Sequence, residues 1–432
     1  MLYNNLSINE KGILTFAGQD TAALAAEYGT PLLLMDMDLV RSRCREYRSA
    51  MQDFLPAGSM PFYASKALSY KGIYKLMKEE NMGVDVVSAG ELYTALQAGF
   101  LAENICFHGS SKTDRDIRFA IEKGVGVFVC DSTQELEAIE AEAARQGICQ
   151  KVLLRLQPGI DPHTHEKIST GRIDCKFGVA IETGQAEAFV GLALSKPHVK
   201  LLGYHCHIGS QIFDPEPFRD AAVMMLAFCA EMQKKHGYYP QVLNLGGGMG
   251  VPYVEGHPTI RYRDNIRAIG QLIEKTCREQ ALEMPAIWME PGRSIVADAG
   301  ITLYTAVSTK TIPGFRNYVA VDGGMGDNPR FALYQAEYTV LPADRMNDTR
   351  DFTCTVAGCC CESGDLIQEN VALPEPKRGD LLAVLTTGAY NYSMASNYNR
   401  VPRPPIVTVE GSKVSVAVRR ETWEDIVKYD IE

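Results

Sequence analysis

Short apolar runs recur along the first two-thirds of the chain and alternate with helical patterns. Runs of strand length lie at 31–35, 60–64, 83–87, 104–108, 125–130, 151–156, 199–207, 241–245 and 286–290. Helical patterns lie between them, for example at 90–99, 133–146, 218–235 and 262–279. This alternation is typical of a parallel sheet and favours a closed (β/α)8 TIM-like barrel. Such a barrel needs eight strands, so one of the nine runs, such as a lead-in strand at 31–35, lies outside it. An open doubly wound sheet is the alternative.

The alternation of strand-like and helical patterns ends after about residue 298. Strand-like runs follow at 302–309, 318–321, 353–357, 381–386 and 413–419, with few helices between them. This pattern predicts a second, mostly β domain, either a barrel or a sandwich. We therefore predict an N-terminal segment 1–30 that pairs with the β domain through a strand at 13–16, an α/β barrel over 31–297 and a β domain over 298–432.

Composition describes a globular protein with ample apolar material. Of the 432 residues, 46% are hydrophobic and 22% are charged, and the net charge is −10. An acidic chain is not expected to bind nucleic acid or an anionic membrane surface, and no apolar run approaches the roughly 18 residues of a membrane span. The N-terminus lacks the features of a signal peptide. Twelve scattered cysteines without a Cys-x-x-Cys pair indicate reduced thiols and a cytoplasmic location.

Polar residues fall where the predicted strands end. In a parallel barrel, the loops after the carboxyl ends of the strands form the active site. These positions hold Lys66, Asp85, Ser88, Glu91, His108, Arg155, His207, Gly246–Gly248 and Glu290. We therefore expect these residues to share one mouth of the barrel.

A lysine and a glutamate at that mouth suit pyridoxal phosphate. Lys66 can form a Schiff base with the aldehyde, and Glu290 can keep the pyridine nitrogen protonated so that the ring accepts electrons. A lone lysine after a strand is ordinarily a surface residue. Here the apolar neighbours Ala67 and Leu68 are expected to lower its pKa and favour this chemistry.

The glycine run Gly246–Gly248 suits a phosphate group. It lacks the later acidic residue of a dinucleotide fingerprint and the Gly-Lys-Ser/Thr of a P-loop. Backbone without side chains can still approach a phosphate closely and direct N–H groups at it. A turn that requires a positive φ is the plainer alternative.

Two histidines precede that run, at His205 and His207. Residues two apart in a strand point the same way, so both could face the barrel interior. A third metal ligand of clear spacing is lacking, and we predict no metal. We expect instead an imidazole stacked on an aromatic cofactor, with the Ser210 hydroxyl at its phosphate.

The predicted β domain carries a second polar cluster. Cys361 and Glu362 follow an apolar strand, Tyr390 precedes a polar and aromatic run, and Arg330 and Tyr334 lie four residues apart. Taken alone, these look like ordinary turns. Chemically, a thiol with a pKa near 8.5 can donate a proton, arginine suits a carboxylate, and glutamate suits an ammonium group.

Five motifs together resemble the diaminopimelate decarboxylases, which are fold-type III pyridoxal-phosphate enzymes related to ornithine decarboxylases. The motifs are Tyr63–Ala67, His207–Gln211, Gly246–Gly250, Glu290–Ser294 and Cys361–Asp365, and segments 165–171 and 176–178 are similar as well. The resemblance covers nearly the whole chain. It implies a pyridoxal-phosphate-binding (β/α)8 barrel with a C-terminal β domain, in a homodimer whose active sites lie at the subunit interface.

The resemblance also implies roles for matching residues. Lys66 resembles the Schiff-base lysine, Glu290 the acid at the pyridine nitrogen and Cys361 the proton donor, while His207 is expected to stack on the ring. The implied cofactor-binding residues are Lys66, Asp85, His207, Ser210, Gly247, Gly248, Glu290, Gly292, Arg293 and Tyr390. The implied substrate-binding residues are Arg293, Arg330, Tyr334, Glu362 and Tyr390. Cys361, Glu362 and Tyr390 are expected to act from the partner subunit, and Glu91 matches an acidic position near the lysine.

The implied reaction is decarboxylation of meso-2,6-diaminopimelate to L-lysine and CO2, the last step of lysine biosynthesis. Glu362 stands where ornithine decarboxylases have aspartate, and a distal amino-acid centre needs both a cation and an anion for recognition. Three positions depart from the family pattern: Phe331 replaces a proline, Asn391 a glycine, and Ile406 stands where an acidic residue is common. They bear on fine specificity and loop shape rather than on the reaction class.

Other functions are alternatives. Ornithine, lysine or arginine could be the amino acid that is decarboxylated. An amino-acid racemase shares the two-domain plan but usually places an arginine at the pyridine nitrogen, so Glu290 favours decarboxylation. A non-catalytic cofactor carrier is typically a single domain, and a decoy homologue tends to lose the lysine or cysteine that this chain keeps.

Overall fold

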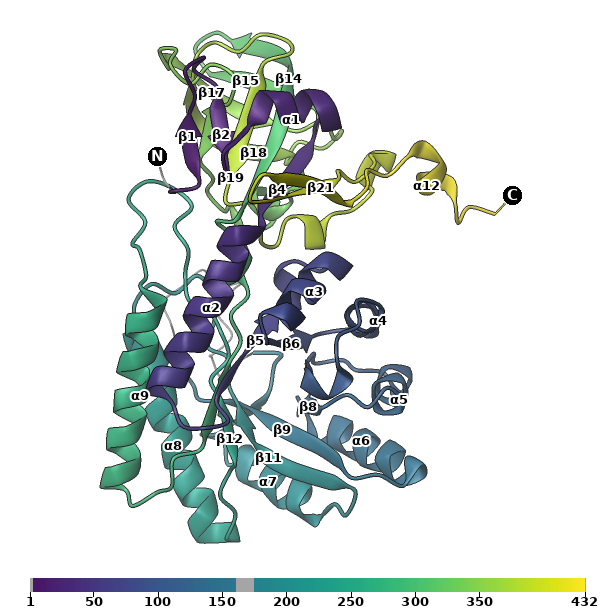
Figure 1. The fold of residues 1–432 in the computed structure, drawn as a ribbon. Coiled ribbons are helices and arrows are strands. Elements are labelled where there is room, and N and C mark those ends of the chain that lie inside the picture. The colour runs from purple at the N-terminus through teal and green to yellow at the C-terminus, as the bar shows by residue number, and fades with distance from the viewer. Residues whose placement is uncertain (1–2, 161–174, 432) are drawn as a thin grey trace. The chain divides into compact units, whose positions relative to one another are not determined.

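The computed structural model describes residues 3–160 and 175–431 and divides into two compact units (Figure 1). The barrel unit comprises residues 43–250 and 259–292, and the β unit comprises residues 1–42, 251–258 and 293–432. The chain passes between them inside helix α2 (Met37–Phe54). The similarity noted at 165–171 lies outside the described residues.

The barrel unit contains the predicted parallel barrel. Strand pairing runs from β5 through β6, β7, β8, β9, β11, β12 and β13 and returns to β5, so eight strands within the described residues close on themselves. Their bounds are β5 Met60–Ala64, β6 Gly83–Val86, β7 Ile105–Phe107, β8 Val127–Cys130, β9 Gln150–Gln157, β11 Val199–His205, β12 Val242–Asn244 and β13 Ala286–Met289. A short strand, β10 (Val179–Ala180), extends the sheet beside β9. The predicted barrel is confirmed, and the open sheet is wrong.

Helices connect successive strands of the barrel. They are α3 Lys71–Glu79, α4 Ala89–Gln97, α5 Asp114–Glu122, α6 Thr133–Gln146, α7 Gln185–Ser195, α8 Glu216–His236 and α9 Tyr262–Glu279, with short 3-10 turns η1 Ser65–Ala67 and η2 Ala102–Asn104. Side-chain caps determine where several of them begin: Ser132 accepts the backbone N–H of Glu135 at the start of α6, and Thr113 forms a capping box with Asp116 at the start of α5. These contacts satisfy N–H groups that have no partner within the helix.

The β unit is built around a mixed sheet. Its strand order is β18-β17-β15-β14-β4-β20-β21, with β19 pairing β14 and β16. The bounds are β4 Leu32–Asp36, β14 Gly300–Ile312, β15 Arg316–Val321, β16 Val340–Pro342, β17 Phe352–Ala357, β18 Leu366–Leu373, β19 Leu381–Leu385, β20 Ile406–Glu410 and β21 Lys413–Val418. A separate small sheet of β1 Leu6–Ile8, β2 Leu14–Phe16 and β3 Gln19–Asp20 precedes α1 Thr21–Tyr28. Short helices α10 Arg293–Val296, α11 Arg330–Tyr334 and α12 Trp423–Val427, with 3-10 turns η4 Tyr392–Met394 and η5 Tyr398–Arg400, complete the unit.

The first of the nine predicted runs belongs to the β unit. Strand β4 pairs antiparallel with β14 and parallel with β20, and all five of its residues are buried. It packs into a core with Leu14, Ile301, Leu303 and Val407. Residues 31–42 therefore belong to the β unit, whereas the sequence pattern placed them at the start of the barrel. A strand buried on both faces has no alternation that would indicate which sheet it joins.

No helix in the part of the chain that the structure describes has the length and apolar character needed to cross a membrane.

Candidate active site

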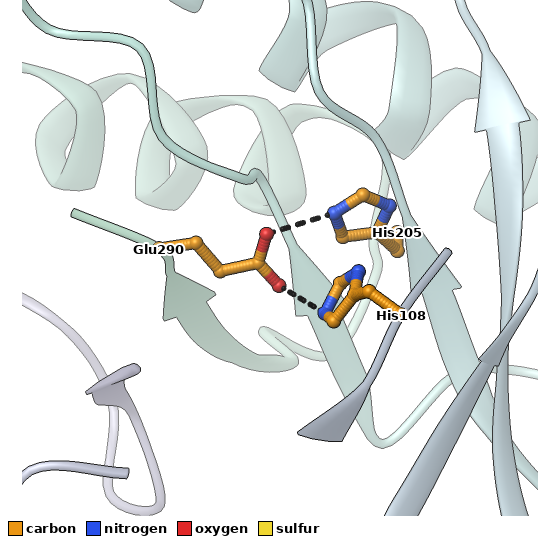
Figure 2. A group of neighbouring side chains, drawn as sticks. All are labelled: His108, His205 and Glu290. Atoms are coloured by element: carbon orange, nitrogen blue, oxygen red, sulfur yellow. Dashed lines mark hydrogen bonds and ion pairs between the residues drawn. The ribbon is translucent and has the colours of Figure 1, made fainter. Parts of the chain in front are cut away.

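Polar side chains from five strand ends converge inside the barrel around the carboxylate of Glu290. Glu290 follows β13 directly, His205 and Asn244 are the last residues of β11 and β12, and His108 follows β7. The Nε2 atom of His108 lies 2.8 Å from Glu290 Oε1, and Nε2 of His205 lies 3.1 Å from Oε2 (Figure 2). Asn244 donates its side-chain N–H to Oε1 over 2.6 Å. Asp85 on β6 lies beside this group, with its Oδ1 3.9 Å from His108 Nε2.

The surroundings of Glu290 favour its ionised form. Burial raises the pKa of its carboxyl, but His108 and His205 outweigh burial and lower that pKa well below its ordinary value. Burial lowers the pKa of His205 to about 4, so this imidazole is neutral at physiological pH. The pKa of Asp85 is raised, chiefly by burial, and the charge of Glu290 adds to this effect. The two buried carboxyls are therefore shifted in opposite directions.

Lys66 lies in η1, directly after β5. Its neighbours Ser65 and Ala67 are buried, but the Lys66 side chain itself is exposed, unlike the apolar setting that the sequence predicted. The Ser65 hydroxyl lies at hydrogen-bond distance from two acceptors, Glu91 Oε2 at 2.8 Å and the backbone carbonyl of Asp85 at 2.6 Å. The charge of Lys66 opposes the upward pKa shifts of both Asp85 and Glu91. The structure thus brings the lysine close to both of these acids.

The glycine run packs tightly against the loops on either side. A Cβ atom would lie 2.5 Å from the Cys206 carbonyl oxygen at Gly246, 2.1 Å from that of Glu290 at Gly247, and 2.3 Å from that of Gly209 at Gly248. A larger residue could not occupy these positions without moving backbone. The loop that carries Ser210 joins the run through hydrogen bonds from Ile212 N to Gly248 O and from Gly250 N to Ile212 O.

Two further contacts place His207 and Gly292 at this loop cluster. The backbone N–H of Gly247 donates to His207 Nδ1 over 3.2 Å. Burial, with Lys66 and Arg155, lowers the pKa of His207 well below its ordinary value, so its ring is neutral. A Cβ at Gly292 would lie 3.0 Å from the Cβ of Ala64, next to the lysine turn. The candidate phosphate-binding residues Ser210, Gly247, Gly248 and Gly292 therefore belong to one set of adjoining loops.

These residues fit pyridoxal phosphate. The group needs an amine for its aldehyde, an acid for its ring nitrogen and backbone N–H groups for its phosphate. Lys66 and the ionised Glu290 supply the first two features within the barrel unit. In the side-chain-free run 246–248, the N–H groups of Gly246 and Gly247 already donate to Asn244 and His207, so Gly248 is the residue of the run whose N–H suits a phosphate. Asp85 Oδ1 and His205 Nδ1 are also buried polar atoms without a hydrogen-bond partner among the described residues, which indicates a polar interior suited to a polar ligand.

The β unit holds its own buried cationic cluster. Arg293 donates to the Tyr253 hydroxyl over 2.6 Å, and Arg330 donates to the Tyr338 hydroxyl over 2.8 Å. Both guanidinium groups also lie over the Tyr253 ring, at 5.7 and 5.0 Å from its centroid. Although burial raises the pKa of Tyr253, the two arginines outweigh it and lower that pKa. Two buried guanidinium groups that share phenol partners favour an anionic ligand.

Tyr390 and Asn391 adjoin this cluster. The guanidinium of Arg293 lies 4.7 Å from the Tyr390 ring centroid, and Tyr390 has a positive φ of 61°. Asn391 is buried and accepts a hydrogen bond from the Tyr338 hydroxyl over 3.2 Å. The asparagine that replaces the family's glycine thus supports the tyrosine that contacts Arg330.

The remaining predicted residues of the β unit lie on more open surface. Cys361 and Glu362 are exposed in the turn between β17 and β18, where Asn399 accepts the backbone N–H of Cys361 over 2.7 Å. Tyr334 is half-buried at the end of α11, and Phe331 is half-buried on the same helix. Ile406 is buried in β20 beside Leu33, a place unsuited to an acidic residue.

Sequence reasoning missed three residues of these clusters. Asn244 lies at a strand end, so the rule that found His108 would have found it, but it was treated as part of an apolar run. Tyr253 and Tyr338 carried no local signal, because their partners Arg293 and Arg330 are set by tertiary contacts. For His205, the sequence predicts a side chain that could face the barrel interior but not its partner, because the contact with Glu290 is a long-range one.

Comparison with known proteins identifies a family, relatives and solved structures that the chain resembles. Residues 37–297 match the family described as "Pyridoxal-dependent decarboxylase, pyridoxal binding domain". The chain is 46% identical to the diaminopimelate decarboxylase of Bacillus subtilis (strain 168) over 425 residues, which cover 98% of this chain and 96% of that relative. A crystal structure of diaminopimelate decarboxylase from M. jannaschii superposes with a TM-score of 0.92 at 34% identity, covering 99% of this chain and 98% of that one. A structure of that protein in complex with L-lysine gives a TM-score of 0.91 at the same identity and the same coverage.

Proposed function

Because the chain belongs to the diaminopimelate decarboxylases, a family of pyridoxal-phosphate-dependent decarboxylases, we propose that it converts meso-2,6-diaminopimelate into L-lysine and CO2. The observation that carries this proposal is the buried, ionised carboxylate of Glu290 at the carboxyl end of the barrel. An acid that stays charged inside a barrel is suited to hold a protonated ring nitrogen. A racemase, which usually places an arginine at that nitrogen, does not fit this arrangement.

Each part of the site has a task toward the cofactor. Bound pyridoxal phosphate supplies the electron sink that decarboxylation requires. Lys66 would hold the cofactor covalently, and Glu290 would keep the proton on the ring nitrogen. Ser210 would offer its hydroxyl and Gly248 its backbone N–H to the phosphate, while Gly247, which has no side chain, would let the loop come close. The N–H of Gly247 orients the ring of His207, which would face the cofactor ring.

Four further residues are proposed as cofactor contacts. Gly292 and Arg293 would add an amide and a guanidinium at the phosphate, and Asp85 and Tyr390 would complete the set. The glycine at 292 is supported by its close approach to Ala64. The buried guanidinium of Arg293, with Tyr253 as its partner, offers a positive charge that is already desolvated.

The residues proposed to bind the substrate belong to the β unit. The buried Arg330 guanidinium binds a carboxylate, the exposed Glu362 binds the distal ammonium group, and Tyr334 borders the same region. Arg293 and Tyr390 serve substrate as well as cofactor. The Cys361 thiol would give a proton to the α-carbon that has lost its carboxylate. Both Cys361 and Glu362 are exposed, so they are accessible to a substrate.

We further propose that the protein is a cytoplasmic homodimer in which Cys361, Glu362 and Tyr390 complete the site of the partner subunit. Exposed apolar side chains support self-association: Trp423, Tyr429 and Ile431 in the C-terminal segment are 80%, 84% and 96% exposed. Apolar surface of this kind is ordinarily covered by a partner. Free thiols across the described residues are consistent with a reducing compartment.

The direct test is to incubate cofactor-loaded protein separately with meso-diaminopimelate, ornithine, lysine and arginine. Released CO2 and the amine or amino-acid product are measured by mass spectrometry. We expect CO2 and lysine from meso-diaminopimelate alone. Equal or greater CO2 release from ornithine or lysine would assign the chain to another decarboxylase, and loss of optical rotation without CO2 would make it a racemase.

The covalent role of Lys66 is tested by borohydride reduction. Wild-type protein should retain a pyridoxyl label on the peptide that contains residue 66, and Lys66→Ala should lose it. The matched control is Lys71→Ala, which removes an exposed lysine at the start of α3 and should keep the label. A label that persists at another site in Lys66→Ala would contradict the assignment.

A further inference from the structure

The acceptor atoms of Glu290 are almost fully used before any ligand binds. Oε1 lies 2.8 Å from His108 Nε2 and 2.6 Å from Asn244 Nδ2, and Oε2 lies 3.1 Å from His205 Nε2. Figure 2 shows the two imidazoles, each facing a different oxygen of the carboxylate. A carboxylate has about four acceptor sites. Asn244 and His205 take two of them through hydrogen bonds, and His108 Nε2 contacts Oε1 as an ion pair without a hydrogen bond, which leaves an acceptor site on Oε2.

The direction of the Asn244 contact is determined by the glycine run. Asn244 Oδ1 accepts the backbone N–H of Gly246 over 2.9 Å. Because a backbone N–H can only donate, the other end of the amide, Nδ2, must be the atom that faces Glu290. One side chain thus connects the candidate phosphate loop to the acid. Glu290 N also donates to Gly246 O over 2.8 Å, which ties the same two segments through the backbone.

The protonation state and tautomer of His205 are also determined by its contacts. Its Nε2 faces an ionised carboxylate and must carry the proton, whereas its Nδ1 has no hydrogen-bond partner among the described residues. Burial disfavours a second proton on this ring. The ring is therefore a neutral Nε2–H donor. His108 packs edge-on against it, with ring centroids 4.9 Å apart.

His108, His205 and Glu290 carry ligand atoms within 4.8 Å of one another, which is close enough to hold a cation. The contacts favour a hydrogen-bonded network instead. Each imidazole Nε2 already lies at hydrogen-bond distance from a carboxylate oxygen. The N–H group of Asn244, which a cation would repel, points at Oε1.

We propose that His108, His205 and Asn244 are positioning residues that hold Glu290 as an oriented carboxylate with one acceptor site free for the ring N–H of the cofactor. This inference rests on the proposed function. A proton shared between a carboxylate and a ring nitrogen moves toward the more basic partner. The hydrogen bonds from Asn244 and His205 and the close imidazole of His108 make the Glu290 carboxylate less basic and so keep that proton on the ring. If the loss of one donor raises the pKa of the carboxylate by one unit, the partition of the proton between carboxylate and ring changes about tenfold.

The test follows the ring nitrogen itself. Protein loaded with pyridoxal phosphate labelled with ¹⁵N in the ring is compared by NMR for wild type, His205→Leu and His108→Leu. The chemical shift is calibrated with free cofactor in acid and in alkali. Wild type should show a protonated nitrogen at pH 7, and each leucine variant should move toward the unprotonated position. His205→Gln, which keeps an N–H donor, should return most of the wild-type shift.

Kinetics and a control variant separate positioning from general damage. Each leucine variant should lower kcat about tenfold or more while KM changes less than about threefold. His198→Leu removes another histidine that pairs with a glutamate, Glu140, at 3.0 Å on the barrel exterior, and it should leave the ¹⁵N shift and kcat unchanged. Wild-type shifts in both His205→Leu and His108→Leu would overturn the proposal.

A measurement on the unaltered protein covers the case in which a leucine variant fails to fold or to bind cofactor. In ¹⁵N-histidine-labelled wild type, His205 should remain a neutral Nε2–H tautomer from pH 6 to 8, with Glu290, His108 and Arg155 as the titratable and charged groups that act on it. A proton on Nδ1, titration in that range, or stoichiometric bound metal in the purified protein would overturn the proposal. Wild type that carries a protonated ring nitrogen but makes no lysine would instead overturn the proposed function.

Discussion

Replacing Gly247 with alanine tests whether the glycine run determines the position of Glu290. A Cβ at this position would lie 2.1 Å from the Glu290 carbonyl oxygen and 2.9 Å from its carbonyl carbon. Both neighbours are backbone, so no flexible side chain can turn away. Since real Cβ contacts essentially never fall below 3.0 Å, the two segments must separate by about 1 Å, and a misplacement of that size can lower catalysis about a hundredfold.

The same clash should lower stability. Forcing an extra carbon into a packed site typically costs about 1–3 kcal/mol. We therefore expect Gly247→Ala to lower both kcat and Tm. The assay is CO2 release from meso-diaminopimelate with a thermal melt of the same cofactor-loaded sample.

Gly191→Ala is the matched control. Gly191 lies within helix α7, and a Cβ there would meet its nearest heavy atom, on His236, at 3.7 Å. Alanine is favoured over glycine in a helix interior by up to about 1 kcal/mol, so Tm should not fall and kcat should not change. Wild-type kcat in Gly247→Ala would refute the reasoning, as would an equal loss in Gly191→Ala.

Other changes test separate parts of the molecule. Cys361→Ala should lower kcat by about a hundredfold or more, as expected for loss of a proton donor, with little change in substrate affinity; Cys359→Ala should have neither effect, and an unchanged kcat in Cys361→Ala would remove the donor role. Burial raises the pKa of Asp327, which accepts a hydrogen bond from Tyr304, to about 7 from 3.8. The folded protein therefore binds more protons than the unfolded chain between these values, and the stability from this group is full below pH 3.8 and lost as pH rises through 7. Asp327→Asn should flatten the profile of Tm between pH 5 and 8, and an unaltered slope would contradict this. Thr113→Ala should destabilise helix α5 by about 1 kcal/mol through loss of its cap, whereas Thr113→Ser should retain Tm.

Much of the barrel could be predicted from the sequence because its signals are local. The helices predicted at 133–146 and 262–279 match α6 and α9 in both bounds. The strand predicted at 60–64 matches β5 in the same way. In each case, periodicity and end signals agree with the tertiary structure.

The parts that could not be predicted depend on distant partners. Strand β18 was missed because its sequence, Leu366–Leu373, mixes Gln and Glu with apolar residues and reads as surface. Its place is set by pairing with β17. At the candidate site, the strand-end rule gathered Asp85, His108 and Glu290 correctly. It could not show that His108 lies closer to Glu290 than to Asp85, since that depends on side-chain geometry.

The placement of β4 has a consequence for the order of folding. Its two neighbours, β14 and β20, come from residues 300–312 and 406–410, so a strand made near the start of synthesis waits for segments made near the end. The barrel strands, by contrast, are complete by residue 289. We expect the barrel to form on the ribosome while Leu32–Asp36 still lacks its β20 partner and is open to chaperones, and protease resistance of the barrel in nascent chains stalled before residue 400 would reveal this sequence of events.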